Sequence, residues 1–377
     1  MSPVPVARFL HGPLPDAVAQ ALARIAAAPD VVRVAAMPDV HLADEVCVGT
    51  VVATRRLLYP AAIGSDLGCG VAAVRFDVAA ADLDAGAAAR VLAGLYAAVP
   101  RNRHRRADLP PWPEGLDPDQ TAFSAPGLRA IAVHDGRAQL GTLGNGNHFI
   151  ELQRDDDGAL WLMLHSGSRG MGPAIRAHHE RRAVTTGAGL TALDAGDATG
   201  RDFLADVDWA IRYADANRSL MVRAVSSILA DVLGAKVVEG SGFACHHNHV
   251  RREEHGGEPL WVHRKGAISA ADEEAGIIPG SMGSPSFHVA GRGHAEALAS
   301  SSHGAGRLMG RAEARRRISV RDVERQLSGV WFDHRRIDEL RDEAPGAYKD
   351  IGQVMRAQAD LTRIVRRLCP VLCFKGA

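Results

Sequence analysis

The sequence has 377 residues, of which 46% are hydrophobic and 23% charged, and these fractions exclude a disordered or fibrous chain. Its 44 basic residues balance its 44 acidic ones, so no overall positive charge indicates nucleic-acid binding, and an anion site has to be built locally. Five cysteines are too few for a disulfide framework in a chain of this size. There is no basic N-terminal segment followed by an apolar run, and no apolar stretch of membrane-spanning length. We therefore expect a cytoplasmic protein without a membrane segment.

The first part of the chain is predicted to alternate helices, strands and glycine-rich turns. The prediction rests on Ala-rich stretches for helices and on apolar β-branched runs for strands. In chain order we expect a helix over 15–28, strands over 31–36 and 51–58 joined by a loop over 38–50, a turn over 64–70, a strand over 71–76, a helix over 80–98, and a proline-rich loop over 100–127.

The second part is predicted to continue the mixture. We expect two strands within 141–152 and 160–170, one or two amphipathic helices over 203–233, short strands and loops over 241–310, helices over 306–328 and 348–367, and a strand over 371–377. No internal repeat or low-complexity linker is present, and the polar motifs are spread from residue 39 to residue 376. We therefore expect an α+β fold, with residues 1–377 forming one large domain of β-sheets and surrounding helices.

The turn IGSDLGCGV over 63–71 places a carboxylate and a thiol close together. Asp66 and Cys69 are three residues apart among three glycines, so both side chains can face one point while the backbone approaches closely. A carboxylate and a thiolate arranged in this way suit a divalent metal ion. A glycine-rich turn around a buried cysteine would have the same sequence, and this segment alone leaves both interpretations open.

Histidines beside small residues supply further candidate ligands. His148 and His165 lie at two consecutive predicted strands, and CHHNH over 245–249 adds three more, which strand alternation divides between two faces. No C-x₂-C pair of a zinc finger is present. Imidazole with carboxylate admits Mn²⁺, whereas a thiolate suggests Zn²⁺, so the residue types leave the metal open. These candidate ligands are too many for one tetrahedral ion and suit two ions that share the thiolate. The candidates are Asp66, Cys69, His148, His165 and His247.

Two glycine-rich runs, IIPGSMGSPSF over 277–287 and SSSHGAGR over 300–307, predict a site for an anion. Backbone N–H groups of such turns, with the N-terminus of the helix predicted at 306, can surround a phosphate. His303 lies at the mouth of this cradle, where it can attack a phosphoryl group and form a phosphoramidate. Neither run matches a Walker A or a dinucleotide-binding pattern, and a small-residue loop without a ligand is the alternative interpretation.

Together these segments resemble the RtcB family of GTP-dependent RNA ligases. The resemblance implies that GTP guanylylates a histidine, that GMP passes to an RNA 3′-phosphate, and that a 5′-hydroxyl attacks this end and releases GMP. A 2′,3′-cyclic phosphate end is hydrolysed first. Ten blocks in the family's order carry the resemblance: MPDVH (37–41), PAAIGSDLGCGV (60–71), GTLGNGNHFIEL (141–152), MLHSGSRG (163–170), CHHN (245–248), RKGAIS (264–269), GIIPGSMGSPSF (276–287), SHGAGR (302–307), YKDI (348–351) and KG (375–376).

The resemblance also implies a role for each matching residue. His303 corresponds to the guanylylated nucleophile. One Mn²⁺ would be held by Asp66, Cys69 and His148, and a second by Cys69, His165 and His247. The implied contacts to the guanylate are Asn147, His148, Glu151, Asn248, Pro279, Gly280, Ser281, Met282, Ser286, His303, Gly304, Ala305, Gly306 and Lys375.

One segment departs from the family pattern. After MPDVH, the residues ADEVCVG replace the glycine-rich stretch of many relatives, and we expect Asp44 and Glu45 there to repel an RNA phosphate. RNRHR over 101–105 is the best local basic patch for RNA, although a solvated loop has the same composition.

We favour a ligase for RNA repair or tRNA splicing because no ligand or nucleophile position is lost. Its partners would be broken transfer or ribosomal RNA and an archease-type activator protein. The alternatives are a guanylyltransferase that caps 3′-phosphate ends with little ligation, and an inactive RNA-binding relative.

Overall fold

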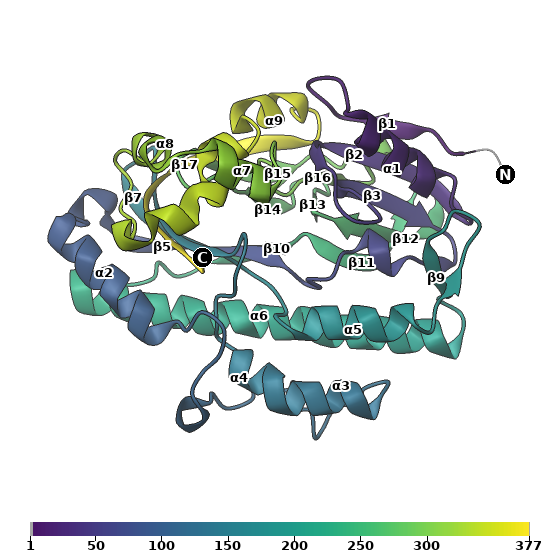
Figure 1. Cartoon of the computed structure of the whole chain (residues 1–377), viewed down its shortest axis with the longest axis horizontal. Coiled ribbons are helices and arrows are strands. Elements are labelled where there is room, and N and C mark those ends of the chain that lie inside the picture. Colours follow the sequence, from purple (N-terminus) through teal and green to yellow (C-terminus); the bar gives the residue numbers. More distant parts are fainter. Residues whose placement is uncertain (1–2, 377) are drawn as a thin grey trace.

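Two large β-sheets form the centre of the structure, a computed structural model that describes residues 3–376 (Figure 1). The five-stranded sheet has the order β1 (Val6–Arg8), β2 (Val31–His41), β3 (Val48–Thr54), β12 (Glu258–Lys265) and β11 (Asn248–His255). The seven-stranded sheet has the order β10 (Phe243–His246), β5 (Gly70–Ala79), β7 (Ala159–Ser166), β6 (Phe149–Asp155), β17 (Thr362–Lys375), β15 (Ser286–Gly291) and β14 (Ala275–Ile278). Two small sheets pair β13 (Ala267–Ser269) with β16 (Ser300–Ser302), and β9 (Thr191–Asp194) with β4 (Leu57–Leu58) and β8 (Val184–Thr185).

Helices cover the sheets on two sides. Figure 1 shows the long helix α6 (Ala198–Leu233) running along one side of the sheets. On the opposite side lie α7 (Arg311–Arg317), α8 (Val320–Gln326) and α9 (Ile351–Ala357). The remaining helices are α1 (Asp16–Ala26), α2 (Ala85–Ala98), α3 (Pro126–Ile131), α4 (Arg137–Gln139) and α5 (Met171–Glu180).

Helix α6 is held by its apolar side chains, which recur at helical spacing. Met221, Val225 and Leu229 are fully buried against Val91 and Leu95 of α2 and against the seven-stranded sheet. Each such side chain contributes about 1.5–3 kcal/mol when it leaves water. The helix ends where Gly234 adopts a left-handed conformation with φ of 67°. Its position along the sheets is therefore fixed by packing over several turns.

The α+β fold is confirmed, and most of the predicted elements are present. Residues 203–233 lie in a single helix, and 100–127 contain no strand and only short helical turns. Within residues 3–376, no helix has both the length and the apolar character needed to cross a membrane. Residues 1, 2 and 377, which belong to the predicted domain and terminal strand, lie outside the described residues.

Two predicted helices are wrong in part. The segment over 306–328 becomes helical only at Arg311 and divides into α7 and α8, because the Ser319 hydroxyl accepts from the Asp322 N–H and caps a second helix. In the segment over 348–367, only α9 is helical. Residues from Thr362 onward form β17, which pairs with β15 and β6. Ladder hydrogen bonds from distant strands outweigh the local helical pattern there.

Candidate active site and metal centre

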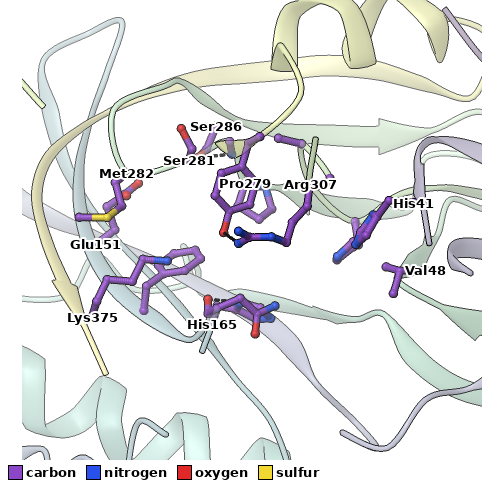
Figure 2. Close-up of a pocket in the computed structure, with 18 of the residues that line it drawn as sticks. His41, Val48, Glu151, His165, Pro279, Ser281, Met282, Ser286, Arg307 and Lys375 are labelled. Carbon is purple, nitrogen blue, oxygen red and sulfur yellow. Dashed lines mark hydrogen bonds between the residues drawn. The ribbon is translucent and has the colours of Figure 1, made fainter. Parts of the chain in front are cut away.

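A cavity of about 270 Å³ lies where segments of both large sheets converge. His41 and Val48 come from β2 and β3, whereas Glu151 and Lys375 come from β6 and β17. In Figure 2, Lys375, Glu151 and Met282 lie at one end of the cavity and His41 and Val48 at the other. The glycine-rich loops close it, and its volume approaches that of a small-molecule site.

The five predicted metal ligands come together beside this cavity. Two groups share the Cys69 thiol, one with Asp66 and His148 and the other with His165 and His247, and within each group the ligand atoms lie within 4.8 Å of one another. The Cys69 Sγ lies 3.6 Å from Nε2 of His148 and 3.2 Å from Nε2 of His165. Since the sulfur belongs to both groups, the arrangement suits two cations with a shared thiolate.

Backbone hydrogen bonds aim the imidazoles into the cluster. His148 donates from Nδ1 to the Leu143 carbonyl at 2.8 Å, and His165 donates from Nδ1 to the Asn147 carbonyl at 3.1 Å. The Nε2 lone pairs therefore face the centre. Burial lowers the pKa of both His165 and His247 well below the usual range, which keeps these rings neutral, as metal ligands must be.

The thiol of Cys69 keeps its proton unless a cation is bound beside it. Burial raises its pKa well above the usual range, and the Asp66 carboxylate raises it further. A bound divalent cation reverses this preference and deprotonates a coordinating thiol. The donor set of one carboxylate, one thiol and three imidazoles therefore fits a pair of divalent metal ions.

Glycines let the ligand turn press against its neighbours. Gly68 has φ of +66° and lies so close to α6 that an added Cβ would be 2.7 Å from the Cα of Ile211. At Gly70, an added Cβ would be 2.3 Å from the Cys245 carbonyl oxygen. The glycine pattern that marked this turn in the sequence thus has a packing cause, and it places Cys69 between α6 and β10.

His303 faces the cavity and is oriented by a buried carboxylate. Its Nδ1 lies 2.6 Å from Oδ2 of Asp39, which has no exposed surface, and its backbone N–H donates to the same oxygen at 3.2 Å. An ionised carboxylate only accepts hydrogen bonds, so the ring proton lies on Nδ1 and the Nε2 lone pair is free. The ring centroid is 4.7 Å from that of His247, so His303 lies directly beside the candidate metal ligands.

The predicted backbone cradle is contradicted in part. The N–H of Gly280 donates to the Ser286 hydroxyl, that of Ser281 to the Ser284 hydroxyl, and that of Ala305 to the Pro279 carbonyl. These donors are used within the protein, and α7 begins too late to direct its N-terminus at His303. The loops line the cavity, but the cationic groups that reach it are the side chains of Arg307, Arg311 and Lys375.

A carboxylate that the sequence analysis did not identify organises these cations. Glu343 is 1% exposed and accepts hydrogen bonds from Lys375 at 2.5 Å, from Tyr348 at 2.8 Å and from Arg307 at 3.3 Å, with Arg311 also bonded to it. Burial opposes ionisation of Glu343, but Lys375 and Arg311 hold its pKa at about 2. In turn, Glu343 raises the pKa of Lys375 despite the burial of the ammonium.

Glu151 lies in the same end of the cavity in a different environment. Burial raises the pKa of its carboxyl to about 8, although the Gln153 amide and the charge of Lys375 act against this. The strand pairing of Lys375 with Phe149 keeps the ammonium near this end. The strand predicted at the chain end is therefore present as far as Lys375, as the last part of β17.

The acidic segment after β2 is partly neutralised. Glu45 forms an ion pair with Arg176 of α5, which also bonds Glu180 at 2.7 Å. Arg176 has 13% of its side chain exposed, so this pairing is well shielded from water. Glu45 is thus compensated, whereas Asp44 remains exposed.

All of the predicted guanylate contacts line the cavity except His148, which lies in the metal cluster, and Asn248. Asn248 instead bridges backbone groups, donating to the Asp66 carbonyl and accepting from the Gly266 N–H. Four further residues at or beside the cavity, Asp39, His41, Arg307 and Tyr348, were not predicted as site residues. All four lie in the blocks that resemble the RtcB family, and this position is the only indication of a role that the sequence contains.

Comparison with known proteins gives a consistent result along the chain. The sequence profile of the family described as tRNA-splicing ligase RtcB matches residues 21–115 and 119–376. RNA-splicing ligase RtcB1 of Escherichia coli is 38% identical over 99% of this chain and 97% of its own length. RNA-splicing ligase RtcB of E. coli strain K12 is 37% identical with the same coverage, and E. coli RtcB2 is 32% identical over 95% of this chain and 92% of its own.

Proposed function

Because the chain belongs to the RtcB family and is an RNA ligase, we propose that it joins 2′,3′-cyclic phosphate or 3′-phosphate ends of RNA to 5′-hydroxyl ends, using GTP and two Mn²⁺ ions. Residues 1–377 act as one ligase domain in the cytoplasm. The substrates are broken transfer or ribosomal RNAs, in RNA repair or tRNA splicing, and an archease-type protein serves as activator.

The observation that carries the proposal is the free Nε2 of His303, held by Asp39 between the metal centre and the cavity. In the first step Nε2 bonds to the α-phosphorus of GTP, the bond from that phosphorus to the β-phosphate oxygen breaks, and pyrophosphate leaves. The ring becomes cationic, and Asp39 offsets this charge through the hydrogen bond from Nδ1. Asp39 is therefore a positioning residue for the nucleophile.

His303 is regenerated in the second step. An oxygen of the RNA 3′-phosphate attacks the α-phosphorus, and the phosphorus–nitrogen bond breaks. The 5′-hydroxyl then attacks the phosphorus at the RNA 3′ end, loses its proton to solvent, and displaces GMP. No oxidant or reductant takes part in these steps. The cleavage of GTP to GMP and pyrophosphate supplies the free energy for joining.

The metal pair would be held by Asp66, Cys69 and His148 at one position and by Cys69, His165 and His247 at the other. Two divalent ions at such a site neutralise phosphate charge and polarise the bond to be attacked. The carboxylate and three imidazoles favour Mn²⁺, and burial lowers the pKa of His165 and His247, which keeps these two imidazoles neutral.

Guanine recognition is assigned to the end of the cavity that contains Glu151 and Lys375. An ammonium donates to the guanine O6 acceptor, and an ionised carboxylate accepts from N1–H and the amino group. Adenine presents the opposite pattern and would leave buried polar groups unpaired. The other predicted contacts that line the cavity would enclose the rest of the nucleotide: Asn147, Pro279, Gly280, Ser281, Met282, Ser286, His303, Gly304, Ala305 and Gly306.

Label transfer from α-labelled GTP to the protein tests this proposal. With Mn²⁺ present, we expect an acid-labile, base-stable adduct whose mass is located on the peptide containing His303. The variant His303→Ala should form no adduct and still bind GTP, because the other residues that line the cavity are unchanged. An adduct of the same stability on His303→Ala would contradict the assignment.

A capping guanylyltransferase remains the second candidate. The observation in its favour is the exposed carboxylate of Asp44 after the MPDVH block, where many relatives have glycines. It predicts a normal protein adduct and RNA that accumulates with a 3′-terminal GMP cap. Joined RNA as the main product would exclude it.

A further inference from the structure

Three polar residues in the middle of α6 contact the segments that carry the metal ligands. Asp215, Asn217 and Arg218, which we call the α6 clamp, lie within four consecutive residues. Asn217 and Arg218 are 0% and 1% exposed. None of the three is itself a candidate ligand, yet their hydrogen bonds end on the segments that carry the candidate ligands. These segments are the turn with Asp66 and Cys69, the strand end with His165, the loop before His148 and the residue before His247.

Arg218 joins two ligand segments through one nitrogen. Its Nη1 donates to the Gly68 carbonyl at 2.9 Å and to the Ser166 carbonyl at 2.7 Å. Gly68 directly precedes Cys69, and Ser166 directly follows His165. The bridging sulfur and one imidazole are thereby fixed to the same guanidinium, whose rigid planar shape sets the spacing between the two backbones.

Asn217 joins the His165 segment to the loop before His148. Its carbonyl oxygen accepts from the N–H groups of Gly141 at 2.7 Å and Thr142 at 3.1 Å. Its amide group donates to the Ser166 hydroxyl at 3.1 Å and to the Gly167 carbonyl at 3.3 Å. Ser166 then donates to the Leu143 carbonyl at 2.8 Å, the same oxygen that orients the His148 ring.

Asp215 connects the fourth segment. Its carboxylate accepts from Arg218 at 2.5 Å and from Nε2 of His246 at 2.8 Å. His246 precedes the ligand His247, whose backbone N–H donates to the Cys69 carbonyl at 2.9 Å. The clamp therefore reaches the segments of all five candidate ligands from one side of one helix.

The energetic cost of this arrangement argues against simple space filling. Burying a guanidinium is unfavourable unless it is paired and hydrogen-bonded, and an apolar side chain of similar size would pack at least as well. Nε of Arg218 is buried without a partner, so the residue is not fully satisfied even here. What the guanidinium provides beyond packing is a fixed distance between the Cys69 and His165 backbones.

We propose that the α6 clamp sets the separation of the ligand segments, so that Asn217 and Arg218 are positioning residues for the metal pair. This inference rests on the proposed function, in which Asp66, Cys69, His148, His165 and His247 hold two Mn²⁺ ions. Outer hydrogen bonds to ligand segments typically change metal affinity by about 10- to 100-fold. We expect losses in that range when Arg218 is replaced.

The test is a titration of chelator-treated protein with Mn²⁺ alone, with electron paramagnetic resonance counting the free ion. Wild type should bind two Mn²⁺ with the signature of an exchange-coupled pair. Arg218→Met should bind at least one Mn²⁺ about 10- to 100-fold more weakly and lose the coupled signal. Arg218→Lys should recover part of the affinity, since an ammonium keeps the charge but cannot donate in a planar fork.

Asp206→Ala is the matched control in the same helix. Asp206 is 2% exposed and bonds Ser124 and His179, neither of which carries or adjoins a ligand. This variant should lose comparable thermal stability and keep both Mn²⁺ affinities and the coupled signal. Equal loss of affinity in Asp206→Ala and Arg218→Met would overturn the proposal, as would wild-type titration of Arg218→Met.

Should Arg218→Met not fold, Asp215→Asn decides the question. Asp215 is 44% exposed, and asparagine keeps the shape of the side chain and an oxygen that can accept from Arg218 while it removes the negative charge. Weaker Mn²⁺ binding by several-fold supports the clamp, and unchanged binding with an unchanged coupled signal overturns it. Wild-type protein that binds no Mn²⁺ contradicts the proposed metal centre itself, and with it the clamp.

Discussion

Replacement of Asp39 by asparagine probes how the nucleophile is held. Asp39 is fully buried, and its Oδ2 receives both the ring Nδ1–H and the backbone N–H of His303. Asparagine has nearly the same shape but no charge, and its amide group can donate to Nδ1. The ring proton then moves to Nε2, and the lone pair that should attack phosphorus is lost.

The expected loss follows from two contributions. A hydrogen bond to a charged group contributes about 1.5–3 kcal/mol, which corresponds to about 10- to 150-fold in rate. Reversal of the tautomer adds to this, since the same replacement lowers the rate of a catalytic triad by about 10⁴-fold. We therefore expect Asp39→Asn to slow formation of the guanylylated protein by about 10²- to 10⁴-fold. GTP binding should change little, because Asp39 does not line the cavity.

The assay is the single-turnover rate of label transfer from α-labelled GTP, with GTP binding measured separately. Asp155→Asn serves as the control. It alters another buried carboxylate, which accepts from the Trp161 indole at 2.8 Å and lies outside the cavity. Guanylylation of Asp39→Asn at the wild-type rate would refute the argument, and so would an equal loss in Asp155→Asn.

Three further predictions concern the metal centre and the nucleotide. Cys69→Ala should reduce bound Mn²⁺ from two per chain toward zero, whereas His165→Ala should keep about one, because only the thiol belongs to both ligand groups. Equal losses of Mn²⁺ in a metal analysis of the two variants would count against a bridging sulfur. Lys375→Ala should weaken guanylylation by GTP at least ~10-fold, about 1.4 kcal/mol, and affect ATP less; an unchanged rate and base preference would remove Lys375 from the site. Burial raises the pKa of Glu151 from 4.5 to about 8, so GTP affinity should rise with pH through about 8 as the carboxylate forms. The contribution of this group to folding stability has the opposite sign: it is present below pH 4.5 and is lost as the pH rises toward 8. In GTP-binding titrations below and above pH 8, Glu151→Gln should abolish this rise of affinity with pH. An unaltered pH profile would exclude Glu151 as the source of the rise.

The sequence predicted the elements whose signals are local. Apolar spacing located α6, and glycines beside histidine, aspartate and cysteine located the candidate metal ligands, because tight turns that expose such groups need residues without a Cβ. The residue types alone were enough to group five candidate ligands around two ions, without knowledge of the fold. These candidates are Asp66, Cys69, His148, His165 and His247. The specific roles, however, came from the family resemblance.

The missed features depend on distant partners. Residues from Thr362 have a pattern compatible with helix, and only pairing with β15 and β6 makes them a strand. Glu343 lies in no recognised block, and the MPDVH block that contains Asp39 does not reveal its partner, yet Glu343 bonds Lys375 and Asp39 bonds His303 from segments far away in the chain. The backbone cradle failed for a similar reason, since Ser284 and Ser286 satisfy N–H groups that the sequence alone leaves free.

The most direct test of the central claim is an end-joining assay on RNA with a 3′-phosphate and a 5′-hydroxyl, incubated with the protein, GTP and Mn²⁺. The account predicts joined RNA, dependent on both GTP and Mn²⁺ and absent with His303→Ala. RNA that only acquires a 3′-terminal GMP would show a capping enzyme. Unchanged RNA from protein that is folded and loaded with Mn²⁺ would contradict the account.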